Sequence, residues 1–331
     1  MIPEFVRGPI APVFSIFEED GTFDPDGQRR FFDFLLLSGA ISAFFVRSGM
    51  GQMYAYEYDD VKLMADTACS HLKGKANVLV GATGIWDRNY EKRPDPKVFT
   101  QQAIELSQYA EQAGANGVVH TLPEAILPQG NETYADVILR YFETINDAVS
   151  CPIFIYQPPG TAAEYILRSP LVEKLADLPN VKGMKASTPD AMYILDICHA
   201  VKNKDFGYII GHEGAFYAGL HSGAKAVIGQ GATLNPQILL AVQDRFDAGD
   251  MDGAQEAQYS VNFLCQAIGN SVEFFKRYAT EKGFPVKTFD RAMKNNPYGG
   301  APRPPLSTEE YETSKRLLET ELAKYTTTSV A

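Results

Sequence analysis

Short apolar and β-branched runs recur about every 30 residues through most of the chain. Between most of them lies a segment of helical length whose apolar positions are spaced by about 3.6 residues, such as Phe99 to Ala113, which stops at Gly114. This alternation predicts strand-helix units with parallel strands. The runs are Ile10 to Phe17, Ala43 to Val46, Asn77 to Ala82, Gly117 to Thr121, Pro152 to Tyr156, Val181 to Lys185, Gly207 to Gly211 and Lys225 to Gly229.

Eight such units within about 240 residues predict an α/β protein with a closed (β/α)8 TIM barrel. An open doubly wound sheet more often stops at about five or six strands. After the eighth run the pattern predicts helices without intervening strands, over Pro236 to Ala248, Met251 to Asn270 and Ser271 to Glu281. We therefore expect a catalytic barrel domain over residues 1–235 and a C-terminal helical domain over residues 236–331.

Two segments depart from this pattern, the polar insertion Trp86 to Pro96 and the Pro-rich stretch Asn296 to Pro305. The insertion follows the third predicted strand, and barrel active sites are built at the carboxyl ends of strands. It is therefore either a loop that covers or shapes a substrate site, or an inert surface loop.

The composition and charge of the chain argue against several classes of protein. Hydrophobic residues make up 45% of the chain, enough for a large core, and this excludes global disorder. The formal charge of -11, without a basic stretch, gives little electrostatic support for a nucleic-acid partner. No run approaches the roughly 18 apolar residues of a membrane span, and the N-terminus lacks signal-peptide features, so we expect a cytoplasmic protein without a membrane partner.

The sequence also gives no indication of a metal or a dinucleotide. No G-x-G-x-x-G follows the first predicted strand. His71, His120, His199 and His221 lack the spacing of metal ligands, and no acidic cluster offers a cage for a hard cation. We predict no metal.

Reactive side chains at strand ends indicate where the chemistry occurs. Lys185 closes an otherwise apolar run, and burial at the barrel mouth would favour its neutral, nucleophilic amine. Such an amine forms a Schiff base with a carbonyl carbon, although Lys185 could instead pair with a carboxylate or extend to solvent. Tyr156 ends the preceding run, where its phenol could shuttle protons or could simply pack.

These residues belong to motifs that resemble the dihydrodipicolinate synthase and N-acetylneuraminate lyase family of lysine-dependent pyruvate aldolases. Ile155-Tyr156-Gln157-Pro158-Pro159-Gly160 is similar to the family's Y-N-x-P-G turn, and Val181-Lys182-Gly183-Met184-Lys185-Ala186-Ser187 is similar to its G-x-K-x-[ST] strand. The resemblance implies that Lys185 is the Schiff-base lysine and Tyr156 the proton-transfer tyrosine. It also implies a homo-oligomer, a dimer or tetramer, and a reaction that needs no cofactor, because the lysine is the electron sink.

The chain departs from this family at two hydroxyl positions and one tyrosine. The turn that binds the substrate carboxylate resembles Ser48-Gly49-Met50-Gly51-Gln52, with Gly49 and Met50 in place of the hydroxyl residues. Its backbone N–H groups could still bind a carboxylate. Where many relatives have Pro-Tyr-Tyr and supply a tyrosine to the neighbouring subunit, this chain has Pro123-Glu124-Ala125.

Other positions bear on the substrate. Thr161 stands where dihydrodipicolinate synthases have an arginine for the carboxylate of their semialdehyde, which argues against that activity. Arg47, beside the altered turn, could replace the lost hydroxyls as a carboxylate clamp or could pair with an acid such as Glu213. By resemblance, Ile228 and Gly229 line the substrate pocket.

These observations predict a lysine-dependent lyase or aldolase that acts on a 2-oxo acid and forms or uses pyruvate, with an aldehyde as the second small molecule. A dehydratase of a 3-deoxy-2-oxo sugar acid would use the same imine. A binding protein that has kept the scaffold but lost turnover is the alternative from another class, motivated by the missing hydroxyls.

Overall fold

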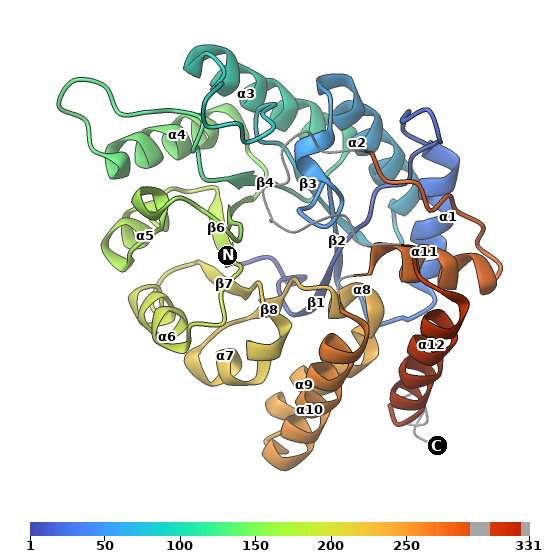
Figure 1. Ribbon diagram of the computed structural model, residues 1–331. Coiled ribbons are helices and arrows are strands. Elements are labelled where there is room, and N and C mark those ends of the chain that lie inside the picture. The colour runs from blue at the N-terminus through green and yellow to red at the C-terminus, as the bar shows by residue number, and fades with distance from the viewer. Residues whose placement is uncertain (270, 292–304, 326–331) are drawn as a thin grey trace.

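The computed structural model describes residues 1–269, 271–291 and 305–325, and within these ranges eight parallel strands close into a barrel in chain order. Each strand pairs with its sequence neighbours, and β1 pairs with β8. Helices surround the ring, as Figure 1 shows. The TIM barrel is therefore confirmed. The strands are β1 (Gly8–Pro12), β2 (Ala43–Val46), β3 (Asn77–Gly81), β4 (Gly117–Thr121), β5 (Ile153–Gln157), β6 (Val181–Ala186), β7 (Gly207–Ile210) and β8 (Ala226–Val227).

The surrounding helices begin and end at residues suited to those positions. Asp24 and Asp95 accept hydrogen bonds from first-turn N–H groups, Thr133 forms a capping box, and Gly114 ends a helix at φ 98°. These helices are α1 (Pro25–Leu36), α2 (Tyr58–Leu72), α3 (Pro96–Ala113), α4 (Tyr134–Ala148), α5 (Ser169–Leu175), α6 (Ala191–Ala200), α7 (Phe216–Ser222) and α8 (Gly231–Leu234), and the 3-10 turns are η1 (Met53–Ala55), η2 (Ala163–Tyr165) and η3 (Glu213–Ala215).

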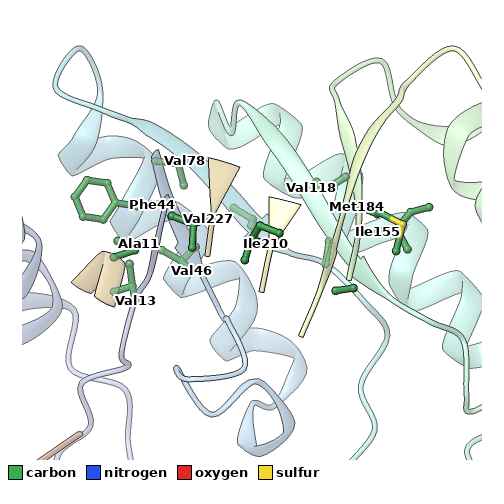
Figure 2. Packing of buried hydrophobic residues seen from close by; sticks show 14 of the residues in the cluster. Ala11, Val13, Phe44, Val46, Val78, Val118, Ile155, Met184, Ile210 and Val227 are labelled. Carbon is green, nitrogen blue, oxygen red and sulfur yellow. The ribbon is translucent and has the colours of Figure 1, made fainter. Parts of the chain in front are cut away.

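Strand side chains alternate between two apolar layers. The outer layer packs against the helices and includes Met184 and Ala186; Figure 2 shows some of its residues, Met184 among them. The inner cluster fills the barrel and includes Phe45 and Tyr156. Because successive strand residues point to opposite faces, Lys185, between two outer-layer residues, points into the barrel.

The first strand is shorter than the sequence predicts. The apolar run continues to Phe17, but β1 ends at Pro12. The Gln28 side chain on α1 accepts the N–H of Ile16 at 3.1 Å and donates to the carbonyl of Phe14 at 3.2 Å. Since this amide satisfies backbone groups that a strand partner would bind, the run leaves the sheet. The other strands begin and end within two residues of the prediction.

The segment after the barrel forms α9 (Pro236–Asp247), α10 (Met251–Ile268), α11 (Val272–Glu281) and α12 (Thr308–Ala323). In Figure 1, α11 lies beside α1. Phe275 of α11 packs on Phe14 with ring centroids 4.9 Å apart, and Tyr278 packs on Phe34 at 6.0 Å. The Pro-rich stretch from Asn296 lies, up to residue 304, outside the described residues.

Candidate active site

Lys185 and Tyr156 lie next to each other inside the barrel, near the carboxyl ends of their strands. The register pairs Thr121 with Tyr156 and Tyr156 with Lys185. Lys185 is 7% exposed and Tyr156 is 2% exposed. The Lys185 Nζ atom lies 4.0 Å from the centroid of the Tyr156 ring. No carboxylate of the described chain forms an ion pair with Lys185, so this amine neither pairs with an acid nor extends into bulk water.

The turn after β2 lies at the same end of the barrel as this pair. The Ser48 hydroxyl donates to the carbonyl of Val13 at 3.2 Å and accepts the N–H of Gly51 at 3.0 Å. The Ser15 hydroxyl donates to the carbonyl of Gly51 at 2.6 Å. Within the described chain the N–H groups of Gly49 and Met50 make no hydrogen bond. The turn is thus fixed by its hydroxyls, while two of its amides remain available to an anion.

Arg47 begins this turn in a left-handed conformation, with φ 48°. Its side chain is 2% exposed, and its Nη1 atom donates to the carbonyls of Gly81 at 3.1 Å and Thr83 at 2.6 Å. The buried Nε atom has no hydrogen-bond partner among the described residues. Burial lowers the pKa of Arg47 to about 10, which leaves it charged at neutral pH. Arg47 does not pair with Glu213, whose carboxylate accepts the N–H of Gly231 at 3.2 Å.

A second buried arginine, which sequence reasoning missed, comes from the insertion Trp86 to Pro96. The Nη2 atom of Arg88 lies 3.1 Å from Glu124, and both side chains are 2% exposed. Arg88 also donates to the Tyr90 hydroxyl at 2.8 Å and to the carbonyl of Gly160 at 2.7 Å. Burial alone would lower the pKa of Arg88, but Tyr54 and Glu124 together raise it.

The Arg88 contacts connect three loops. Arg88 lies after β3, Glu124 after β4 and Gly160 after β5. The Arg93 Nε atom adds a bond to the carbonyl of Glu124 at 3.2 Å. The insertion therefore packs on the carboxyl ends of the neighbouring strands, where it can shape a substrate site. Two sequence features could have indicated this contact: the position of the insertion after the third strand and the altered Pro123-Glu124-Ala125 stretch.

Three further residues that the sequence predicted for the substrate site, Thr161, Ile228 and Gly229, lie after β5 and after β8. The Thr161 hydroxyl donates to the carbonyl of Pro158 at 2.8 Å, directly after the residues that Arg88 contacts. Ile228 is 2% exposed and belongs to the inner cluster. A Cβ atom on Gly229 would lie 2.0 Å from a Glu213 carboxylate oxygen, so a larger residue there would force the Glu213 side chain to move.

A small cavity of about 10 Å³ lies among the ends of β2, β3 and β4, with room for about one water molecule. It brings residues of the turn, the insertion and β4 together around the two buried guanidinium groups. The lining residues are Arg47, Met53, Tyr54, Thr83, Gly84, Trp86, Arg88, Phe99, Thr121, Leu122 and Glu124.

A sequence model of the dihydrodipicolinate synthetase family matches residues 6–320. The chain belongs to this family. It is 29% identical over 260 residues to the Escherichia coli K12 protein named "Putative 2-dehydro-3-deoxy-D-gluconate aldolase YagE", covering 78% of this chain and 79% of that protein. It is 25% identical over 268 residues to the 4-hydroxy-tetrahydrodipicolinate synthase of Dechloromonas aromatica, covering 79% and 84%.

Solved structures agree with this assignment. The crystal structure of E. coli YagE in complex with pyruvate has a TM-score of 0.75 at 25% identity, covering 95% of this chain and 98% of that one. N-acetylneuraminate lyase from Mycoplasma synoviae shares the fold, with a TM-score of 0.74 at 16% identity and coverage of 96% and 98%. Like its relatives in the dihydrodipicolinate synthetase family, the protein is an enzyme of the aldolase and lyase type.

Neither a metal-binding cluster nor a membrane-spanning helix is found among the described residues. No group of His, Cys, Asp or Glu side chains in residues 1–269, 271–291 and 305–325 could hold a metal ion. None of the described helices combines the length and hydropathy needed to cross a membrane. His120 is a buried core histidine, bonded to Ser107 at 2.9 Å and to the Tyr141 hydroxyl at 2.9 Å.

Proposed function

We propose that the protein is a Schiff-base lyase that cleaves a 2-oxo acid to pyruvate and an aldehyde, or runs that reaction in reverse. The observation that carries this proposal is the buried Lys185 amine, 4.0 Å from the Tyr156 ring and without an acidic partner in the described chain. An amine held out of water beside a phenol has both the nucleophile and the proton donor that imine formation requires.

In the proposed reaction the Lys185 Nζ atom bonds to C2 of the 2-oxo acid. The carbonyl oxygen leaves as water, taking a proton from Tyr156, and an iminium remains. The substrate C4 hydroxyl then gives its proton to the Tyr156 phenolate as the C3–C4 bond breaks. The bonding electrons move to the iminium, an aldehyde departs, and the enamine is protonated and hydrolysed to pyruvate and free Lys185. No redox change occurs, so no cofactor is required.

The substrate carboxylate would be held by the turn after β2. The N–H groups of Gly49 and Met50, which make no hydrogen bond within the described residues, supply neutral donors, while Ser48 fixes the turn. The Arg47 guanidinium, whose Nε atom has no hydrogen-bond partner among the described residues, is a group that can bind a carboxylate through two hydrogen bonds. A buried guanidinium without an acidic partner favours an anionic ligand.

The remaining predicted contacts would face the rest of the substrate. We assign Thr161 to the aldehyde half, and Ile228 and Gly229 to the wall of the pocket. The name of YagE and the pyruvate in its structure support a 2-dehydro-3-deoxy sugar acid as the first substrate to test. Family resemblance supports a homo-oligomer and a cytoplasmic location, which we retain as parts of the proposal.

The test follows the methyl protons of pyruvate by NMR in D2O, because an enamine exchanges them for deuterium. The wild type should exchange them, and Lys185→Ala should lose exchange. Lys182→Ala is the matched control, since Lys182 lies on the same strand but pairs with Asp205 at 2.7 Å. Exchange that persists in Lys185→Ala would remove the imine from the mechanism. With a sugar acid as substrate, aldehyde release identifies an aldolase and loss of water alone a dehydratase.

A further inference from the structure

The segment that follows α11 carries Arg291 back to the barrel. Lys276 of α11, whose side chain is 0% exposed, pairs with Asp290 at 2.7 Å. Phe284 packs on Phe34 of α1, with ring centroids 6.0 Å apart. These contacts anchor the segment directly before Arg291 and so determine what this side chain can reach.

Arg291 contacts the turn from Ser48 to Gln52, which the proposed function assigns to the substrate carboxylate. Its backbone N–H donates to the Gln52 Oε1 atom at 3.1 Å. Its Nη1 atom donates to the carbonyl of Ala55, the last residue of η1, at 2.8 Å. Its Nε and Nη2 atoms donate to the carbonyl of Gly21, in the loop after β1, at 2.9 and 2.6 Å. Arg291 therefore joins the end of the turn and η1 to the loop after the neighbouring strand.

The Arg291 guanidinium also has a carboxylate and an aromatic partner. It pairs with Asp60 near the start of α2, and the two side chains are 20% and 18% exposed. Its guanidinium carbon lies 4.4 Å from the centroid of the Phe17 ring. A side chain held by two carbonyls, a carboxylate and a ring has little freedom to move, so it can fix the backbone that it binds.

The Phe17 ring leads to the same turn by a second set of contacts. It packs on Tyr56 with ring centroids 5.9 Å apart. The Tyr56 hydroxyl lies 2.6 Å from the Ser15 hydroxyl, which donates to the carbonyl of Gly51. The next residue, Gln52, has a left-handed backbone with φ 59°, which costs free energy for a residue other than glycine. The last two residues of the turn thus depend on contacts from outside it.

We propose that Arg291 is a positioning residue for the substrate carboxylate, an inference that rests on the proposed function. By holding Gln52, it keeps the turn in the conformation in which the N–H groups of Gly49 and Met50 have no hydrogen-bond partner in the described chain and are available to the anion. Arg291 acts through the turn, and its hydrogen bonds within the described residues do not include Lys185. Its contribution is therefore to binding of the carboxylate and not to bond formation.

The test compares pyruvate with pyruvamide, which has the same reactive ketone but an uncharged amide in place of the carboxylate. The full-length protein is mixed with borohydride and a low concentration of either compound, and the rate of labelling of the Lys185 peptide is measured. The wild type should be labelled faster by pyruvate. Arg291→Ala should reduce this preference about tenfold, because the turn loses its hold on the carboxylate while the amine is unchanged. A merely structural effect would slow labelling by both compounds equally.

Arg291→Lys is the second variant, and it decides the question if the alanine variant does not fold. Lysine keeps a cation beside Asp60, but it lacks the planar fork that donates to the carbonyls of Gly21 and Ala55 together. The preference for pyruvate should fall in this variant too, by less than in Arg291→Ala.

Arg277→Ala is the matched control, because Arg277 has the same kinds of partner on α11. It donates to the carbonyl of Leu306 at 2.8 Å and lies 3.5 Å from the Glu273 carboxylate. Its guanidinium carbon lies 4.2 Å from the centroid of the Tyr311 ring. This variant should keep the wild-type preference.

The outcomes separate this inference from the proposed function. A wild-type preference in the Arg291 variants, an equal loss with both compounds, or a loss as large in Arg277→Ala would overturn the positioning role alone. A wild type that pyruvate and pyruvamide label equally fast would overturn it as well. A wild type in which neither compound labels Lys185 would overturn the proposed function and this inference together.

Discussion

Lys185, Arg47 and Arg88 are basic side chains that the barrel removes from bulk water, and their partners differ in a way that separates their roles. Arg88 has a carboxylate partner in Glu124, so its charge is balanced within the chain. Arg47 has only carbonyl partners, and Lys185 lies over an aromatic ring. The two basic side chains without an acidic partner in the described chain are therefore the ones suited to a substrate with a carboxylate and a carbonyl group.

Removing the Tyr156 hydroxyl should slow proton transfer more than it changes the equilibrium between the free enzyme and the imine. We expect Tyr156→Phe to lower kcat by about a hundredfold or more, since positioned acid-base groups contribute at least that much. Pyruvate should still be trapped on Lys185 after long incubation. Steady-state kinetics and the trapped amount measure the two effects separately, and an unchanged kcat would show that Tyr156 carries no proton.

Arg47→Lys tests the carboxylate clamp. Lysine keeps the charge but loses the planar edge that makes two hydrogen bonds, so KM for a 2-oxo acid should rise about tenfold or more with little change in kcat. Arg29→Lys is the control, because Arg29 pairs with Asp26 on the surface. A KM equal to that of the wild type would indicate that the amides of Gly49 and Met50 suffice.

The sequence predicted Lys185 and Tyr156 because each ends an apolar run, a feature visible along the chain. It missed Arg88 because the contacts of this residue depend on packing between distant segments. Arg88 meets Glu124 across 36 residues, from a left-handed backbone conformation that no local pattern announces. Arg47 was predicted from its position beside the turn, but its hydrogen bonds to the carbonyls of Gly81 and Thr83 depend on the fold.

Helices and strands position the site through their contacts at the carboxyl ends of β3, β4 and β5. The ends of the helices could be predicted from capping residues and glycine, whose effect is local. The end of β1 could not be predicted in this way, because the Gln28 side chain from α1 determines it. The insertion before α3 was predicted as a segment, whereas its contact with the loops after β4 and β5 required the structure.

His120 makes the packing of β4 against α3 and α4 dependent on pH. Burial lowers the pKa of His120 to about 3, below its ordinary value of 6.5. The unfolded chain binds a proton as pH falls below about 6.5, while the folded chain does not, so folding stability is lost in that direction. Between pH 6 and 4, wild type should lose about 1.4 kcal/mol per pH unit more than His120→Gln. Denaturant unfolding at several pH values measures this difference, and equal slopes would show that His120 does not remain neutral.

The helices after the barrel share its outer apolar layer. Phe274, Phe275 and Leu318 belong to the same cluster as the barrel residues Phe14 and Phe31. The sequence indicated where the strand pattern stops, but it could not show that the two parts share a core, because the contacts join residues far apart in the chain. We infer that the barrel depends on the C-terminal helices for stability.

Phe275→Ala tests this dependence. The side chain is 2% exposed and its ring packs on Phe14, so truncation should cost about 3–5 kcal/mol of unfolding free energy. Loss of barrel structure and of C-terminal helix contacts should coincide in denaturant. Two separate transitions, with the barrel transition unchanged, would contradict a shared core.

The most direct test of the proposed function is to incubate the protein with pyruvate, reduce it with borohydride and map the product by mass spectrometry. We predict one reduced pyruvate adduct, located on the peptide that contains Lys185. No adduct, or an adduct on another lysine, would contradict the assignment of Lys185 as the Schiff-base residue.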